Sequence, residues 1–250
     1  MPRLVIRSAA LAERVGFWSA VDHATGMKNT GGSDAAKRRA GEAAADDVEH
    51  GMVVGLGTGS TAAHAIRAIG ERDLDVEGVP TSYQSRRLAI EAGIPLTTLE
   101  EASVDLAIDG ADQVAGTDLV KGGGAAHARE KYVDASADRF VVVADPSKEV
   151  DALDYPVPVE VLPDAQPVVA ERVRGLGGEP ELRAAERKDG PVVTDNGNLV
   201  LDCEFGALDD PGEVAAALSE LPGVVEHGLF VGLADAVYVG TDDGVRVTDA

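Results

Sequence analysis

The stretch "MVVGLGTGSTAAHAIRAIG", residues 52–70, decides the fold. Its first residues are a short apolar run, which enters a loop containing Gly57 and Gly59. The segment from Thr61 to Gly70 then has the composition of a helix. A buried strand followed by a glycine turn and a helix is typical of a parallel sheet with helical connections.

The same alternation continues on both sides of this stretch. Helices are predicted at 33–48, 83–93 and 125–136, and strands at 76–82, 94–99, 104–112 and 139–145. Ser33 or Asp34 is expected to cap the first of these helices. Apolar strands that alternate with helices predict a parallel sheet covered on both faces.

The pattern changes after Asp145. A proline-punctuated segment at 155–163 precedes a helix at 167–178, and an Asn-Gly turn within 191–205 predicts a hairpin of two strands. The later elements are a helix at 209–221, capped by Asp209 or Asp210, and strands at 223–230, 234–241 and 244–249. This part is predicted to be a second α+β unit with an antiparallel sheet.

The composition restricts the function. The chain has 250 residues, 44% of them hydrophobic, and 44 acidic residues against 22 basic ones give a net charge of -22. Such a charge disfavours nucleic acid and anionic membranes as partners, and it is similar to that of proteins from salt-loving microbes. No apolar run is long enough to span a membrane. Cys203 is the only cysteine, which favours a reducing compartment such as the cytoplasm.

Residues 1–26 differ from the rest of the chain. They carry several arginines and the only tryptophan, Trp18. Charge interrupts their apolar stretch, so they do not have the pattern of a signal peptide. They are expected to be a poorly ordered extension, and Met27 is the alternative start.

The glycine loop is the first candidate site. Gly57 and Gly59 permit a tight turn, and Ser60 and Thr61 open a helix whose N–H groups favour an anion. The loop lacks the third glycine of a dinucleotide motif and the Gly-Lys of a P-loop. A single phosphate is therefore favoured over NAD or ATP, and the alternative is a plain turn capped by Ser60.

The stretch "IDGAD", residues 108–112, is the second candidate. Asp109 and Asp112 flank a Gly-Ala turn at the end of an apolar strand, where open parallel sheets bind ligands. Neighbouring carboxylates raise the pKa of one of them, which suits proton exchange between oxygens. In the alternative, Asp109 only accepts a backbone N–H.

The stretch "KGGGAAHAREK", residues 121–131, is the third. The three glycines let backbone amides approach a substrate, while Lys121 supplies a positive charge and Glu130 a carboxylate base. This set suits removal of a proton beside a carbonyl. In the alternative, Glu130 forms a surface pair with Arg129 or Lys131.

The histidines give no support for a metal site. The five of them, at positions 23, 50, 64, 127 and 227, do not have the spacing of metal ligands. His127 lies close to Glu130 in sequence but is expected on the surface of its helix.

Five motifs together carry a resemblance. "GLGTGSTAAHAI", "IDGAD", "KGGGAAHAREK", "ADPSK" and "VVTDNGNLVLD" follow one another in this order. From about Ser33 to the C-terminus the chain resembles the A-type ribose-5-phosphate isomerases. The resemblance implies interconversion of D-ribose 5-phosphate and D-ribulose 5-phosphate through an enediolate, in the non-oxidative pentose phosphate pathway. It implies no metal and no organic cofactor.

The resemblance also implies an architecture. A Rossmann-like α/β domain, residues 27–155 and 229–250, would carry an inserted smaller α+β ferredoxin-like domain at 156–228. The protein would be a homodimer or homotetramer that binds a small-molecule sugar phosphate, with no nucleic acid and no membrane as partner.

The site residues follow the same resemblance. Glu130 matches the general base, Lys121 the residue that stabilises the enediolate, and Asp109 and Asp112 the acids that assist ring opening and proton exchange. The implied substrate and phosphate contacts are Lys37, Thr58, Gly59, Ser60, Thr61, Gly110, Ala111, Gly122, Gly123, Gly124 and Lys148. Gln113 stands where the family usually has Glu, and the loop with Ser82 and Gln84 departs from the serine-rich bacterial form.

Two other readings remain open. A non-catalytic sugar-phosphate sensor would carry a DNA-binding helix-turn-helix and a basic surface, and the sequence shows neither. An amino-sugar phosphate deaminase or a CoA transferase on a related fold would show a catalytic histidine motif or a differently placed glutamate. The order of the motifs favours the isomerase.

Overall fold

The computed structural model describes residues 32–250, and the extension expected at 1–26 lies outside them. The larger sheet has six strands in the order β13-β12-β6-β3-β1-β2. Its strands are β1 (Val53–Leu56), β2 (Glu77–Pro80), β3 (Leu106–Gly110), β6 (Arg139–Ala144), β12 (Ala236–Gly240) and β13 (Val245–Asp249). All neighbours are parallel except the edge pair β12 and β13. The predicted parallel sheet is confirmed, with one antiparallel edge.

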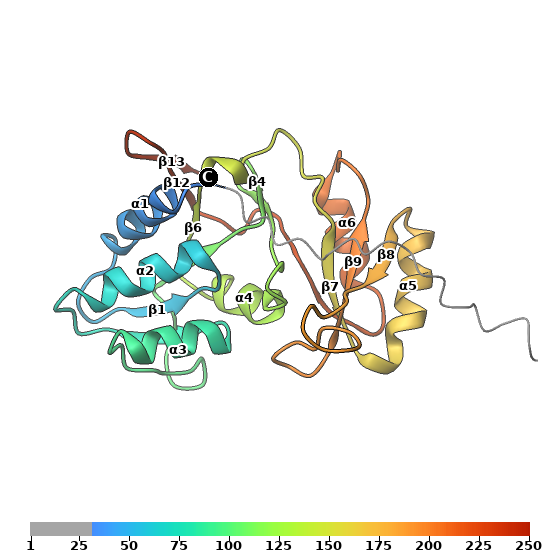
Figure 1. The fold of residues 1–250 in the computed structure, drawn as a ribbon, viewed down its shortest axis with the longest axis horizontal. Coiled ribbons are helices and arrows are strands. Elements are labelled where there is room, and N and C mark those ends of the chain that lie inside the picture. The colour runs from blue at the N-terminus through green and yellow to red at the C-terminus, as the bar shows by residue number, and fades with distance from the viewer. Residues whose placement is uncertain (1–31) are drawn as a thin grey trace, which may run out of the picture.

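Helices cover both faces of this sheet (Figure 1). They are α1 (Asp34–Ala45), α2 (Ser60–Gly70), α3 (Tyr83–Glu91) and α4 (His127–Asp134). Ala40 of α1, Ile66 of α2 and Ala89 of α3 pack on one face, and Val133 of α4 packs with Phe140 on the other. Ser33 caps α1 as expected, but α1 ends at Ala45 rather than at 48.

The smaller sheet has four strands, all antiparallel, in the order β10-β7-β9-β8. Its elements are β7 (Val157–Val161), α5 (Gln166–Gly175), β8 (Glu179–Leu182), β9 (Leu199–Glu204), α6 (Pro211–Ser219) and β10 (Val224–His227). Along the chain these elements follow one another as strand, helix, strand, strand, helix, strand. Together with the sheet order given above, this is the ferredoxin-like arrangement. The fold class is confirmed, and Figure 1 shows the two sheets side by side. The domain limits at 156 and 228 stay a prediction.

A third, small sheet joins the other two. It has the order β11-β5-β4, with β4 (Gln113–Ala115), β5 (Asp118–Val120) and β11 (Leu229–Phe230). The strand predicted at 223–230 is therefore divided at Gly228. A Cβ on Gly228 would lie 2.1 Å from the carbonyl oxygen of Lys121, so only glycine fits between the two sheets there.

Two predicted strands are not formed in full. Residues 94–99 contribute one bridge, between Leu96 and Gly78, because Pro95 has no N–H to extend the pairing. In the predicted hairpin at 191–205 only β9 is a regular strand. Its two edges are taken by β7 and β8, so the segment before the turn makes a single bridge to it, from Val193.

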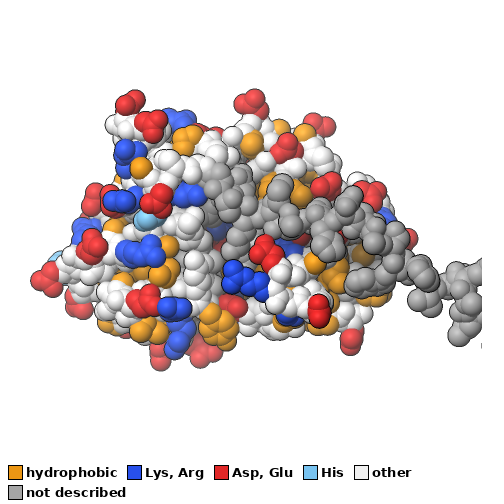
Figure 2. Space-filling model, viewed as in Figure 1, with side chains coloured by type: hydrophobic (Ala, Val, Ile, Leu, Met, Phe, Trp, Pro, Cys, Tyr) orange, Lys and Arg blue, Asp and Glu red, His pale blue; other side chains and the backbone are white. Residues whose placement is uncertain are grey.

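The remaining elements are two short 3-10 helices, η1 (Pro146–Lys148) and η2 (Pro163–Ala165). Within residues 32–250 no helix is long and apolar enough to cross a membrane. Figure 2 shows Asp and Glu side chains along the outline of one face, with Lys and Arg side chains among them.

Candidate active site

A pocket of about 390 Å³ opens where β1 and β3 end, at the carboxyl edge of the large sheet. It is lined by Lys37, Thr58, Gly59, Ser60, Thr61, Gln84, Gly110, Ala111, Asp112, Lys121, Gly122, Gly123, Gly124, Glu130 and Lys148. The structure therefore brings together every residue that the sequence assigned to the site except Asp109, which lies behind the pocket wall.

One end of the pocket is formed by the start of α2. Gly59 is the N-cap with φ of 112°, and no side chain among residues 32–250 caps the helix, so the expected cap by Ser60 is wrong. Lys37 and Lys148 line the same pocket, and the charge of Lys37 acts on Lys148. Burial lowers the pKa of Lys148, while Asp112 and Asp145 act in the opposite direction. Two lysines beside an uncapped helix N-terminus suit a phosphate.

Asp109 fixes the backbone between this end and the rest of the site. It is completely buried, and its Oδ1 accepts the N–H groups of Thr58 at 2.8 Å and Gly110 at 2.6 Å. Its Oδ2 lies 3.0 Å from the Nζ of Lys121. The reading of Asp109 as a backbone acceptor is confirmed for one oxygen, while the other faces the cation, and its role in proton exchange stays a prediction. Burial raises the pKa of Asp109, while Lys121 opposes this shift.

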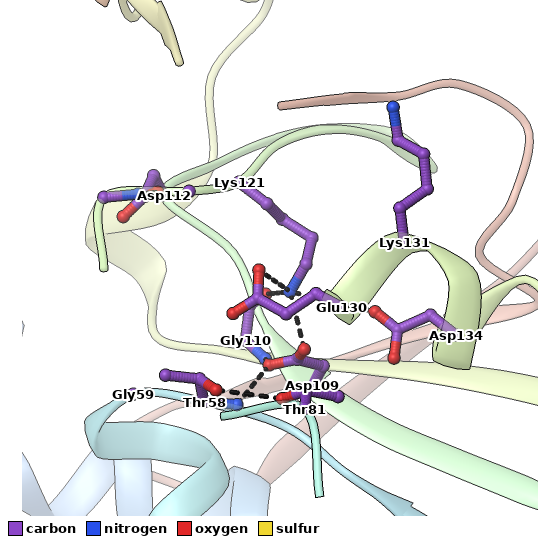
Figure 3. A network of polar contacts seen from close by, with 12 residues as sticks. Thr58, Gly59, Thr81, Asp109, Gly110, Asp112, Lys121, Glu130, Lys131 and Asp134 are labelled. Carbon is purple, nitrogen blue, oxygen red and sulfur yellow. Dashed lines mark hydrogen bonds and ion pairs between the residues drawn. The ribbon is translucent and has the colours of Figure 1, made fainter. Parts of the chain in front are cut away.

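Lys121 is the centre of a buried charge cluster (Figure 3). Only 2% of it is exposed, and its Nζ lies 3.5 Å from Glu130 Oε2 and 3.9 Å from Asp134 Oδ2. It also donates to the carbonyl oxygen of Gly110. Burial disfavours its charge, but the three surrounding carboxylates more than offset this and raise its pKa above the ordinary value. Lys121 therefore stays an ammonium ion.

Glu130 points from α4 toward Lys121 and the pocket (Figure 3). It is 4% exposed, and its Oε2 has no hydrogen-bond partner among the described residues. Burial raises its pKa to about 8, with Lys121 acting in the opposite direction. The alternative surface pair is wrong, because Arg129 and Lys131 bond to other residues. A buried carboxylate at a pocket wall, with an oxygen that accepts no hydrogen bond, is suited to accept a proton.

The glycine turn that separates Lys121 from Glu130 has specific steric demands. Gly122 has φ of 107°, and a Cβ there would lie 2.6 Å from His127 Nδ1. Gly123 donates its N–H to Asp112 Oδ2 at 2.6 Å. A Cβ on Gly124 would meet only Thr58, at 3.7 Å, so this glycine leaves open space at the pocket wall.

The expected surface position of His127 is wrong. Its ring is completely buried beneath the glycine turn, with Nε2 3.3 Å from the carbonyl oxygen of Glu226. Burial, together with the nearby charges of Arg183 and Lys131, lowers its pKa to about 3. It is neutral and supports the turn from below.

Two residues near the site were missed by the sequence analysis. Arg183, which follows β8 in the small sheet, donates to the carbonyl oxygens of Gly122 at 2.8 Å and Gly123 at 3.3 Å. No local pattern marks it, because it reaches the turn from a distant part of the chain. Asp134 lies four residues after Glu130 on α4, and this spacing on one helix face could have identified it.

The positions that depart from the family pattern lie in different places, and only one of the two glutamines lines the pocket. Gln113 does not line the pocket. Its Oε1 accepts the N–H groups of Asp154 at 2.9 Å and Tyr155 at 2.8 Å, so it holds the chain entering the small sheet. Gln84 does line the pocket and accepts the N–H of Gly59 at 3.3 Å. Ser82 bonds the hydroxyl of Thr58 at 2.7 Å.

Within the described range no group of His, Cys, Asp and Glu side chains has the arrangement of a metal site. The carboxylates of Asp109, Glu130 and Asp134 surround the Lys121 ammonium instead.

Comparisons with known proteins identify the family of the chain. The model of the family "Ribose 5-phosphate isomerase A (phosphoriboisomerase A)" matches residues 77–244. The chain is 71% identical over 224 residues to ribose-5-phosphate isomerase A of Natronomonas pharaonis, a match covering 88% of this chain and 100% of that protein. The corresponding protein of Halobacterium salinarum is also 71% identical over 224 residues, with coverage of 89% and 100%.

Solved structures show the same similarity. Ribose 5-phosphate isomerase A of Methanocaldococcus jannaschii superposes with a TM-score of 0.83 at 46% identity, covering 86% of this chain and 98% of that one. A D-ribose-5-phosphate isomerase in complex with phospho-erythronic acid gives a TM-score of 0.83 at 43% identity, with coverage of 86% and 97%. The Plasmodium falciparum enzyme gives 0.82 at 31% identity, with coverage of 87% and 99%.

Proposed function

The chain belongs to the ribose 5-phosphate isomerase A family, and from this premise we propose that Glu130 is its catalytic base and Lys121 its electrostatic stabiliser. The protein is an aldose-ketose isomerase that interconverts D-ribose 5-phosphate and D-ribulose 5-phosphate in the pentose phosphate pathway. The reaction moves one proton from C2 to C1 of the open-chain sugar and one proton between the two oxygens.

The pocket orients the substrate by its charges. The phosphate binds at the N-terminus of α2, beside Lys37 and Lys148, where its negative charge is stabilised. The carbonyl end then extends toward Glu130 and Lys121, which line the same pocket. This orientation directs the reacting carbons to the buried charge cluster.

The proton transfer follows from the positions of Glu130 and Lys121. The Glu130 carboxylate removes the proton from C2, and the electrons of that bond form the enediolate with negative charge on oxygen. Lys121 stabilises this charge, and Glu130 returns the proton to C1. A preorganised cation that contributes about 3 kcal/mol accelerates such a step roughly a hundredfold. Asp112, in the pocket, assists ring opening and proton exchange at the oxygens, while Asp109, buried behind it, holds the backbone at Thr58 and Gly110.

The observation that carries this assignment is Oε2 of Glu130, which has no hydrogen-bond partner among the described residues and faces the Lys121 ammonium. It lies in a buried pocket, 3.5 Å from a lysine that stays charged. An ammonium ion beside the base stabilises an anionic intermediate, and the same ion keeps the base from becoming permanently protonated.

We also propose that the enzyme acts in the cytoplasm as a homo-oligomer with an acidic surface. The single, buried Cys203 is consistent with a reducing compartment. The net charge of -22 supports the acidic surface and opposes binding of nucleic acid.

The test is an assay of ribulose 5-phosphate formation from ribose 5-phosphate without added metal, at low salt and in molar KCl. Glu130→Gln is expected to lower kcat by roughly 10²- to 10⁴-fold, the usual contribution of a general base. Glu42→Gln, at an exposed position of α1, is the control and should match the wild type.

Three outcomes separate the possibilities. Loss of activity in Glu130→Gln alone supports both the function and the base. Activity retained in this variant keeps the function and transfers the base to Asp109 or Asp112. No turnover by folded wild-type protein in either salt contradicts the isomerase and favours a sugar-phosphate sensor.

A further inference from the structure

Asp134 is a buried acid to which the proposed reaction assigns no role. It lies on α4 one turn after Glu130, and Figure 3 shows its carboxyl group turned toward Asp109 and Lys121. Its exposed fraction is 1%, and neither carboxyl oxygen has a hydrogen-bond partner among the described residues. An acid buried in this way requires a physical account.

The charges of the cluster do not balance if every group is ionised. Lys121 faces Asp109 at 3.0 Å, Glu130 at 3.5 Å and Asp134 at 3.9 Å. One positive and three negative charges leave two negative charges without compensation in a nearly dry site, and Asp112 adds its field to Glu130 from the pocket side. Buried charge without a partner is strongly unfavourable, so protons must neutralise part of the cluster.

The surroundings of each acid indicate where a proton resides. Asp109 accepts two backbone N–H groups and lies nearest to Lys121, which favours its ionised form. Glu130 opens to the pocket and must alternate between its charged and neutral forms during turnover. Asp134 has no donor of its own and lies farthest from the ammonium group, so it is the acid that gains least from ionisation.

We propose that Asp134 is held as a neutral acid behind Lys121, and that it positions the Lys121 and Asp109 side chains so that, of the three acids around Lys121, only Glu130 changes its protonation during turnover. This proposal rests on the function proposed above for Glu130 and Lys121. A neutral Asp134 leaves Asp109 and Lys121 as a balanced pair. The neutral Asp134 donates its proton toward Asp109, whose Oδ2 is ion-paired with Lys121 at 3.0 Å and accepts no other hydrogen bond among the described residues.

The direction of the Asp134 pKa agrees with this geometry. Burial raises it well above the ordinary value, and the negative charges of Asp109 and Glu130 act in the same direction, against Lys121. This direction favours the neutral form of Asp134.

The first experiment detects the proton without any assay of activity. Infrared spectra of Glu130→Gln protein at neutral pH should contain the carbonyl stretch of a buried, protonated carboxylic acid. The double variant Glu130→Gln/Asp134→Asn should lack it. A band that persists in the double variant assigns the proton to another acid and overturns the proposal, as does a band that is absent from both proteins.

The second experiment measures positioning through the pH profile of kcat/KM. Asp134→Asn keeps the shape of a neutral acid and is expected to retain at least one third of wild-type activity, with the acid limb moved by less than about 0.3 pH unit. Asp134→Ala admits water behind Lys121, so it should lose about tenfold in kcat and shift the acid limb to lower pH. Asp138→Asn, at an exposed position close in sequence, is the control.

An acid limb that falls by about one unit in Asp134→Asn would show that Asp134 carries a negative charge, which contradicts the proposal. Wild-type kinetics in Asp134→Ala would show that the residue positions nothing. If Asp134→Ala does not fold, the pH profile of Asp134→Asn and the infrared bands still test the proposal. A failure of these tests leaves the Glu130→Gln assay unaffected, so the two proposals are judged separately.

Discussion

Glu130 shows how burial sets the chemistry of a single side chain. Its ordinary pKa of 4.5 is raised to about 8, mainly because the surroundings exclude water. Motifs with a glycine turn between a lysine and a glutamate suggested this residue as a base, but its depth in the structure could not be read from the sequence. Helix periodicity alone left a surface pair with Arg129 or Lys131 open, because burial depends on strands that are distant in the chain.

The raised pKa predicts the pH dependence of catalysis. The base must be ionised to accept the C2 proton, so kcat/KM should be high above about pH 8 and fall tenfold per unit as the pH decreases below that value. Lys121 remains an ammonium ion in this range and should add no alkaline limb there. The measurement is the pH profile of the isomerisation at constant ionic strength. An acid limb near the ordinary value of 4.5 would contradict the raised pKa of Glu130.

The positions of two further residues could not be predicted from the sequence. Arg183 was missed because its contact with Gly122 joins residues about sixty positions apart, and nothing near it in sequence signals a target. His127 was placed on the surface because a lone histidine in a helix is more often exposed. The structure buries it because Gly122 has no side chain and leaves room for the ring.

Among the elements, the glycine turn at 122–124 connects the two halves of the site. Its glycines were expected to allow close approach to the substrate, and the structure adds a separate reason for Gly122. The backbone there has φ of 107°, and the ring of His127 occupies the space of a side chain. This turn is therefore a constraint on stability as well as on the pocket.

Gly122→Ala is expected to destabilise the protein by about 1–3 kcal/mol, because alanine is strained at this φ and its Cβ collides with His127. Urea unfolding at constant pH measures the change. Gly175→Ala is the control, since Gly175 ends α5 and an added Cβ there meets nothing within 4 Å. Equal stability of the two variants would contradict this account of the turn.

The strands illustrate which elements a sequence can specify. Apolar runs identified β1, β3 and β6, because buried parallel strands need hydrophobic residues on both faces. The pairing of β9 with both β7 and β8 could not be foreseen, because competition for a strand edge is settled by the whole sheet. The hairpin expected at 191–205 is reduced to a bridge for this reason.

At the scale of the whole molecule, the site lies where the sheets meet. Lys121 follows β5 of the small three-stranded sheet, and its backbone N–H bonds the carbonyl oxygen of Gly228 at 2.8 Å. Arg183 reaches the same turn from the ferredoxin-like sheet. The motifs predicted the contents of the site, whereas the way in which the second sheet supports it required the three-dimensional structure.

The net charge of -22 makes a prediction about the whole molecule. Repulsion among the acids opposes the compact state, and salt weakens it, because the screening length falls from about 10 Å at 0.1 M to about 3 Å at 1 M. The free energy of unfolding, measured with urea, should therefore rise by about 1 kcal/mol or more between 0.1 M and 1 M KCl, at least a fivefold change in the folded-to-unfolded ratio. Sucrose at equal osmolality is the control, since it is excluded from the surface without screening charge. A rise of the same size in the free energy of unfolding in sucrose would assign the effect to exclusion of the solute from the protein surface. A free energy of unfolding that does not depend on KCl would show that the acids are spaced widely enough not to repel one another.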